Sequence, residues 1–327
     1  EAGTGRLVLT GLFLLVALLL SRFSWDLPIT DDAERALYDN REYYLSPLVE
    51  PDQRVVIIAY DDQSLIQLEK RSPLPRDTLA AALRNIDGLG AKAIGIDILF
   101  DQPQAEDAEL IETLRTMQTP VAVGYADLVT NQLDIEYEQQ AFLDEFMAAL
   151  EGSNAHPASI RLAENDGVTR VWPEIIEGTP ELLGRAMLRD AGEPLVDRFE
   201  GYEGAIRYRR PLYIEEPVFS TLQIIPFSID AIFEVPEARA DFEEAIRDSY
   251  VLIGGDIIDY DRALTPLSEF IDPAVEAGAR QVRPPGIQIH AATIAQMLDG
   301  ARLVQPSSLF LWSLAFLTVI AATLTAL

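Results

Sequence analysis

The chain has 327 residues, of which 49% are hydrophobic, and a formal net charge of −28. This length and hydrophobic content allow one large domain or two small ones and exclude a wholly disordered chain. The negative charge argues against nucleic acid or an anionic lipid surface as a partner, because both bind basic faces. The absence of cysteine excludes disulfides, cysteine-ligated zinc and thiol catalysis.

The charge is confined to the middle of the chain. Neither Leu7–Ser21 nor Leu303–Leu327 contains a charged residue. Outside Arg22–Arg302 only Glu1 and Arg6 are charged, and these two cancel. All 28 net negative charges therefore lie between two apolar ends.

Both ends are predicted to be transmembrane helices, at residues 5–25 and 305–327, surrounded by membrane lipid. Ser307–Leu327 has 21 residues, and about 20 apolar residues cross a bilayer core. The first run is shorter and could be the core of a signal peptide, but no small-residue cleavage pattern follows it. Trp25 and Trp312 suit the membrane interface. We expect the chain to be part of a longer protein whose second span is the first of several.

Two spans place the residues between them on one side of the membrane. One span, a large loop and a return span are the layout of a receptor with an extracytoplasmic sensor. We therefore expect an integral protein of the bacterial inner or plasma membrane. Residues 31–46 are predicted to form a juxtamembrane helix, and residues 47–302 a periplasmic or extracellular sensor domain.

Short apolar runs alternate with amphipathic segments along this loop. Buried strands are predicted at 55–60, 91–100, 120–124 and 250–254, and helices at 75–86, 105–118, 236–248 and 286–298. This order predicts an α/β fold, with a mostly parallel, doubly wound sheet and flanking helices.

The middle of the loop is less regular. We predict helices at 139–150 and 178–192, an edge strand at 205–210, and a hairpin turn at Asn165-Asp-Gly, where positive φ angles are needed. The polar remainder of 126–160 is left unassigned.

Carboxylates gather where the predicted strands end. Ligands of open parallel sheets bind beyond the carboxyl ends of the strands, and seven aspartates lie there, including Asp259 and Asp261. The candidate ligand-binding residues are Asp61, Asp62, Arg76, Asp97, Asp101, Gly254, Gly255 and Asp256. Such a rim would suit a hard metal ion or a protonated small molecule, and whether it binds a metal is left open.

A structural role is the alternative for the same residues. Aspartate at a strand end commonly caps the next helix or turn. Asp97 differs, because it lies inside an apolar strand and needs a partner, for which Arg76 is a candidate.

Signatures of known catalytic sites are missing from the loop. It has no phosphate-binding glycine loop and no serine nucleophile elbow, and neither His156 nor His290 has a second histidine at metal-binding spacing. His290 is predicted to face the core or a helix contact. We predict no catalytic residue, and keep an extracytoplasmic metal enzyme using the acidic rim as an alternative.

Several segments, taken in order, resemble the type-two CHASE family of extracellular sensory domains, which are attached to cyclases, histidine kinases and protein kinases. They are Tyr38–Arg41, Val55–Asp62, Pro73–Arg76, Gly90–Phe100, Asp166–Arg170, Val251–Gly255, Thr265-Pro266 and Pro285–Ala291. The resemblance covers nearly the whole loop, although Pro73 stands where members commonly have tryptophan and 126–160 does not match.

The resemblance implies a sensor that signals through the second span to an output domain outside the chain. A class III adenylate cyclase, making cAMP from ATP with Mg²⁺ or Mn²⁺, is the first expectation. A histidine kinase, diguanylate cyclase or protein kinase is the alternative output, and a purely structural dimerisation domain the alternative role. The chain itself is then expected to hold no cofactor, to form a homodimer and to respond to an unknown small molecule or ion.

Overall fold

The computed structural model describes residues 2–24, 27–70, 72–131, 135–213, 216–258, 262–268, 283–304 and 306–326. Trp25, Asp259 and Asp261, which the sequence singled out, lie outside these residues. The chain divides into two compact units. One, the terminal unit, contains residues 1–45 and 303–327, and the other, the α/β unit, contains residues 46–302.

The terminal unit consists of three helices, α1 (Ala2–Arg22), α2 (Pro28–Leu45) and α12 (Ser308–Ala326). Among the described residues, α1 and α12 are the helices long and apolar enough to cross a membrane, with a mean hydropathy of 2.0 over Gly3–Arg22 and 1.9 over Ser308–Thr325. The ring of Phe23, which follows α1, packs edge-to-face on Trp312 at 5.9 Å. The helix α2 covers most of the segment predicted to be a juxtamembrane helix.

A six-stranded sheet forms the centre of the α/β unit. Its strand order is β5-β4-β3-β10-β2-β9, and every neighbouring pair is parallel. The strands are β2 (Asp52–Asp61), β3 (Ala93–Asp97), β4 (Val121–Tyr125), β5 (Ala155–Ser159), β9 (Phe219–Gln223) and β10 (Tyr250–Asp256). The predicted parallel sheet is thus confirmed, and its central strands are the β-branched runs that can be buried on both faces.

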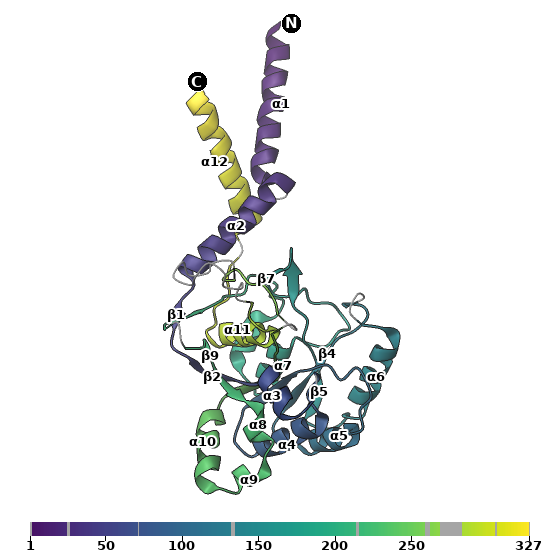
Figure 1. Ribbon diagram of the computed structural model, residues 1–327. Helices are drawn as coiled ribbons and strands as arrows, with labels where there is room; N and C mark the ends of the chain where they lie inside the picture. The colour runs from purple at the N-terminus through teal and green to yellow at the C-terminus, as the bar shows by residue number, and fades with distance from the viewer. Residues whose placement is uncertain are drawn as a thin grey trace. The chain divides into compact units, whose positions relative to one another are not determined.

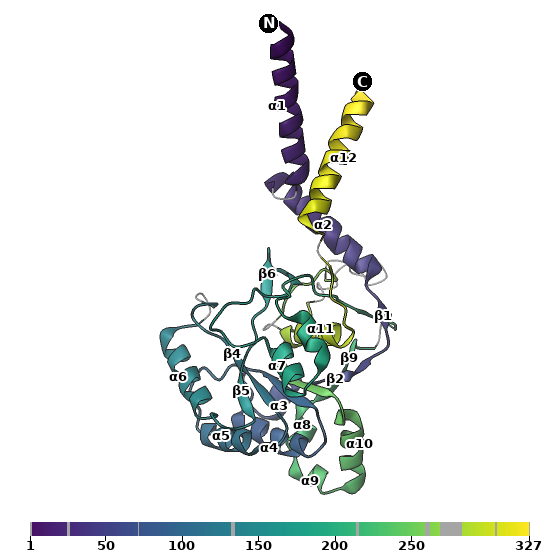
Figure 2. The ribbon, with the colours of Figure 1, turned by 180° about the vertical axis from the view of Figure 1, so that it is seen from behind.

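Helices cover both faces of this sheet (Figures 1 and 2). One core holds residues of α4 (Arg76–Asp87), α5 (Asp107–Thr116), α6 (Tyr137–Ala148), α8 (Ile224–Phe227) and α10 (Pro236–Ile246). The other holds residues of α7 (Leu183–Asp190), α11 (Gly286–Leu298) and the 3₁₀ helix η2 (Pro194–Phe199). Two short helices complete the unit, α3 (Asp62–Gln67) and α9 (Asp230–Phe233).

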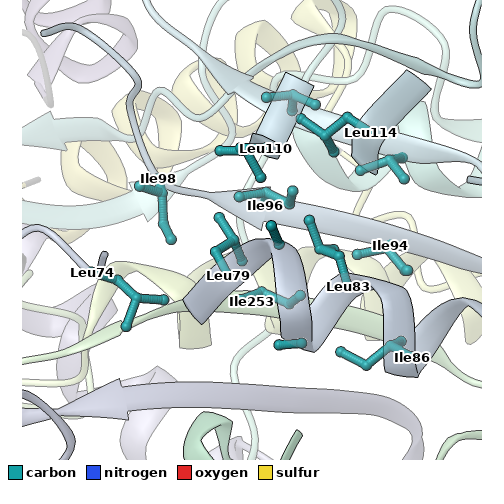
Figure 3. Packing of buried hydrophobic residues seen from close by; sticks show 14 of the residues in the cluster. Leu74, Leu79, Leu83, Ile86, Ile94, Ile96, Ile98, Leu110, Leu114 and Ile253 are labelled. Atoms are coloured by element: carbon teal, nitrogen blue, oxygen red, sulfur yellow. The ribbon is translucent and has the colours of Figure 1, made fainter. Parts of the chain in front are cut away.

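The helix α4 shows how the sequence pattern produces this packing. Leu79, Leu83 and Ile86 recur at helical spacing and are buried, while Arg84 faces outward. Figure 3 shows these side chains against Ile94 and Ile96 of β3 and other residues of the same core. The apolar face of α4 is therefore buried against the sheet.

Smaller pairings lie outside the main sheet. The predicted hairpin is present as the antiparallel strands β6 (Ala163–Asn165) and β7 (Val168–Val171), and Asp166 and Gly167 between them both have positive φ. The edge strand predicted at 205–210 does not form as a continuous strand: Ala205 makes an isolated antiparallel bridge with Val171, and β8 (Arg210–Pro211) pairs with β1 (Leu48–Val49). Two edge strands of the main sheet, β5 and β9, were not predicted.

Candidate functional site

The predicted rim exists at the carboxyl ends of three adjacent strands. Asp256 at the end of β10 stands opposite Asp61 at the end of β2. On its other side, Gly254 of β10 stands opposite Asp97 at the end of β3. The structure thus brings Asp61, Asp97, Gly254, Gly255 and Asp256 to one edge of the sheet.

The carboxylates of β2 have structural contacts. Asp61 is the N-cap residue of α3, and its side chain accepts hydrogen bonds from the backbone N–H and the hydroxyl of Ser64, both at 2.8 Å. Asp62 accepts a hydrogen bond from the backbone N–H of Ile258 at 3.1 Å. The capping interpretation therefore describes Asp61, and Asp62 ties α3 to the loop after β10.

The next two carboxylates are also engaged. Asp256 forms an ion pair with Arg262 at 2.5 Å, six residues later in the same loop. Asp101 accepts a hydrogen bond from the side-chain amide of Gln139, which holds the loop after β3 to α6. The first contact lies within the loop after β10 and the second joins the loop after β3 to α6, so both stabilise loops at the rim.

The crevice beside Gly254 is filled by protein. A Cβ atom on this residue would lie 2.7 Å from Cδ1 of Ile287 and 3.1 Å from Cβ of Asp97. Glycine is thus needed here for α11 to pack on β10. Ile287 at the start of α11 therefore occupies the space beside Gly254.

Asp97 is the exception among the rim carboxylates. It is buried, its Oδ1 lies 3.9 Å from Nε2 of His290 on α11, and its Oδ2 has no hydrogen-bond partner among the described residues. Burial raises the pKa of Asp97 to about 7. His290 faces the core, as predicted, and contacts the one rim carboxylate among the described residues that is removed from solvent.

Arg76 does not pair with Asp97, so that expectation was wrong. Its guanidinium forms an ion pair with Asp107 at the start of α5 and donates a hydrogen bond to the carbonyl of Gln102 at 2.5 Å. Its Cζ also lies 5.2–5.8 Å from three ring centres, those of Phe100, Phe142 and Phe146. Burial lowers the pKa of Arg76 to about 10, against the opposing effect of nearby carboxylates. These contacts make Arg76 an anchor between helices.

A small cavity of about 150 Å³ lies beside this anchor and is lined by Arg76 and Asp101, among others. Sites for drug-sized ligands usually measure about 300–1,000 Å³, so this cavity is small for such a ligand. Within the part of the chain that the structure describes, no three His, Asp or Glu side chains converge on a point where a metal ion could bind. His156 instead contacts Asp190 at 2.7 Å.

A larger pocket lies at the carboxyl end of the edge strand β5. Its volume is about 400 Å³, and its lining includes Ser159, the last residue of β5, with Arg161, Arg185 and several glutamates. Arg185 on α7 is only 4% exposed. The sequence did not predict this site. The strand β5 was not recognised, and composition alone does not show that an arginine is buried. The available signal was Arg185 itself, a charged residue inside the apolar run Leu183–Leu188.

Comparison with known families gives one result. Residues 9–327 match the family model described as CHASE2 domain. Neither curated proteins nor solved structures gave a significant match. The match agrees with the resemblance read from the ordered segments and extends over both units of the chain.

Proposed function

Because the chain belongs to the CHASE2 domain family, whose members are extracytoplasmic sensor domains of signalling receptors, we propose that residues 46–302 sense a signal and pass it along α11. The helix α11 is the last one before α12 in the chain. A change in its position would reach the second span directly. The output domain would then respond on the other side of the membrane.

The observation that carries this proposal is a pair of contacts through Trp172 that connect the edge pocket to α11. The ring of Trp172 lies 4.9 Å from the guanidinium of Arg185, which lines the pocket. The indole N–H of Trp172 donates a hydrogen bond to Oε1 of Gln296 on α11 at 3.0 Å. Gln296 is fully buried and also donates to the carbonyls of Ala205 and Ala301. Two contacts, Arg185 with Trp172 and Trp172 with Gln296, thus connect Arg185 to α11.

A second feature connects the entry and exit of the α/β unit. Asp52 at the start of β2 accepts a hydrogen bond from Arg209 at 2.6 Å, and Arg209 also pairs with Asp299 at the end of α11. Burial alone would raise the pKa of Asp52, but hydrogen bonds from Arg54 and Arg209 outweigh it and lower the pKa to about 2. This network supports the relay, because it holds together the two points where the chain enters and leaves the unit.

For the output we propose a class III adenylate cyclase that uses ATP with Mg²⁺ or Mn²⁺. Family resemblance supports this choice, and a histidine kinase, diguanylate cyclase or protein kinase is the second candidate. A class III cyclase site forms between two chains, so the receptor would act as a homodimer. The apolar helices α1 and α12 would contribute to that dimer, because the α/β unit carries nearly all of the net charge.

The test uses the full-length receptor in membranes and measures cAMP formed from ATP. Trp172→Phe keeps an aromatic ring but removes the donor to Gln296, and Arg84→Gln on the exposed face of α4 is the control. We expect Trp172→Phe to change the basal rate about fivefold, the effect of about 1 kcal/mol of coupling, and the control to leave it unchanged. If deletion of residues 46–302 leaves both the rate and its regulation unaltered, the sensor function is wrong and a structural role remains.

A further inference from the structure

Arg185 is a buried guanidinium with unused hydrogen-bonding capacity. Its Nη2 donates to the carbonyl of Tyr202 at 2.5 Å, and its plane lies over Trp172. No carboxylate lies within 4.0 Å of it in the described part of the chain, and its Nε–H has no acceptor there. Burial lowers its pKa. Burying a charge without a partner is unfavourable, so a carboxylate partner would be strongly favoured here.

A second guanidinium lines the same pocket. The side chain of Arg161 donates from Nη2 to the backbone carbonyl of Glu174, and its Nε is buried without an acceptor among the described residues. A planar guanidinium matches a carboxylate through two parallel hydrogen bonds. Arg161 and Arg185 therefore both line the pocket, and each has an Nε–H donor without an acceptor among the described residues.

Acidic groups line the rest of the pocket. Glu181 is already neutralised by two hydrogen bonds from Arg189, at 2.8 and 2.9 Å. Glu203 accepts a hydrogen bond from the backbone N–H of Ile175 at 2.8 Å. Glu174 and Glu200 also line the pocket, are exposed, and have no ion pair in the described ranges.

We propose that this pocket binds a small zwitterion of the amino-acid type. Its carboxylate would lie on Arg185 and Arg161, and its ammonium group would face Glu174 and Glu200. A volume of about 400 Å³ is ample for such a molecule. The net charge of −28 disfavours a dianion, whereas a zwitterion carries no net charge into this field. The inference deepens the proposed sensor function by naming its ligand class.

Trp172 provides the readout, because its ring contacts Arg185. The chain has three tryptophans, so Trp25→Phe with Trp312→Phe leaves Trp172 alone. The full chain in detergent micelles is titrated separately with each proteinogenic L-amino acid. We expect at least one to change the fluorescence saturably. For that amino acid, the decarboxylated amine and the deaminated acid are the matched probes, and both should bind more weakly.

Variants test the assignment of the two ends. Arg185→Gln is expected to weaken binding about 10- to 100-fold, the effect of losing a hydrogen bond to a charged group, and Arg84→Gln should leave it unchanged. Should Arg185→Gln fail to fold, Glu174→Gln with Glu200→Gln alters only exposed side chains. This double substitution should weaken binding of the amino acid severalfold and leave binding of the deaminated acid unchanged.

Two outcomes would overturn the proposal. One is that no amino acid changes the fluorescence or the thermal unfolding midpoint at millimolar concentration. The other is that succinate, a dicarboxylate, binds as tightly as the best amino acid. Neither outcome affects the cAMP measurement, so the ligand class can fail while the sensor function stands.

Discussion

The central rim and the edge pocket lie at the carboxyl ends of strands of the same sheet, yet they differ in what their charged groups contact. At the rim, Asp61 caps a helix, Asp256 pairs with Arg262, and Ile287 fills the crevice. In the pocket, Arg185 is buried without an acidic partner among the described residues. A charged residue near the strand ends therefore indicates a binding site only where it lines a pocket and the described residues offer it no partner of opposite charge.

The two buried arginines, Arg76 and Arg185, test this comparison most directly. Arg76→Gln is expected to lower the free energy of unfolding by about 3–5 kcal/mol, because it leaves Asp107 without its partner and removes packing on three phenylalanine rings. Arg185→Gln should cost much less, since no carboxylate loses a partner. Thermal unfolding of the full chain in detergent, followed by circular dichroism, measures both. The exposed pair variant Arg84→Gln, at about 0–1 kcal/mol, is the control.

Equal losses of unfolding free energy in Arg76→Gln and Arg185→Gln would contradict this distinction between the two arginines. Arg185 would then be as much a part of the folded scaffold as Arg76, and its unused donor would no longer point to a ligand.

Asp97 makes the stability of the chain depend on pH. Its pKa is about 7 in the folded chain against an ordinary value of 3.8, so the folded state binds an extra proton between these values. Stability should therefore fall as the pH rises from about 4 to about 7 and stay level above, by about 2–4 kcal/mol in all. Asp97→Asn should flatten this profile and be more stable than the wild type at high pH. Unfolding midpoints across this range measure it, with Asp256→Asn, a half-buried rim carboxylate paired with Arg262, as the control.

A profile that remains steep in Asp97→Asn would show that another group controls it.

The sequence predicted the centre of the fold better than its edges. Strands such as Val55–Tyr60 are continuous apolar runs because both of their faces are covered, and these were found. The edge strand β5 contains His156 and Pro157, and β9 is mostly polar (Phe-Ser-Thr-Leu-Gln), so neither has the pattern of a buried strand. Proline is tolerated only at such edges, where a missing N–H does not interrupt the ladder.

The candidate site could likewise be predicted only in part. The rim residues were placed at the right sheet edge because parallel strands share the direction of their carboxyl ends. Their partners could not be predicted, since the pairing of Arg76 with Asp107 depends on how α4 and α5 pack. The pocket needed β5, the loop after it and α7 together, and sequence separation hides that contact.

The smallest expected effect separates capping from cation binding at the rim. Asp61→Ala should lower the free energy of unfolding by about 1 kcal/mol, because the backbone N–H of Ser64 loses its acceptor. Asp61→Asn should cost almost nothing, since asparagine caps helices as well as aspartate does. Urea unfolding of the full chain measures both. A loss in Asp61→Asn equal to that in Asp61→Ala would mean that the negative charge is needed and that the rim holds a cation after all. With the charge dispensable and amino-acid binding in the pocket unaltered by either variant, the rim acts as scaffold and the pocket as the site.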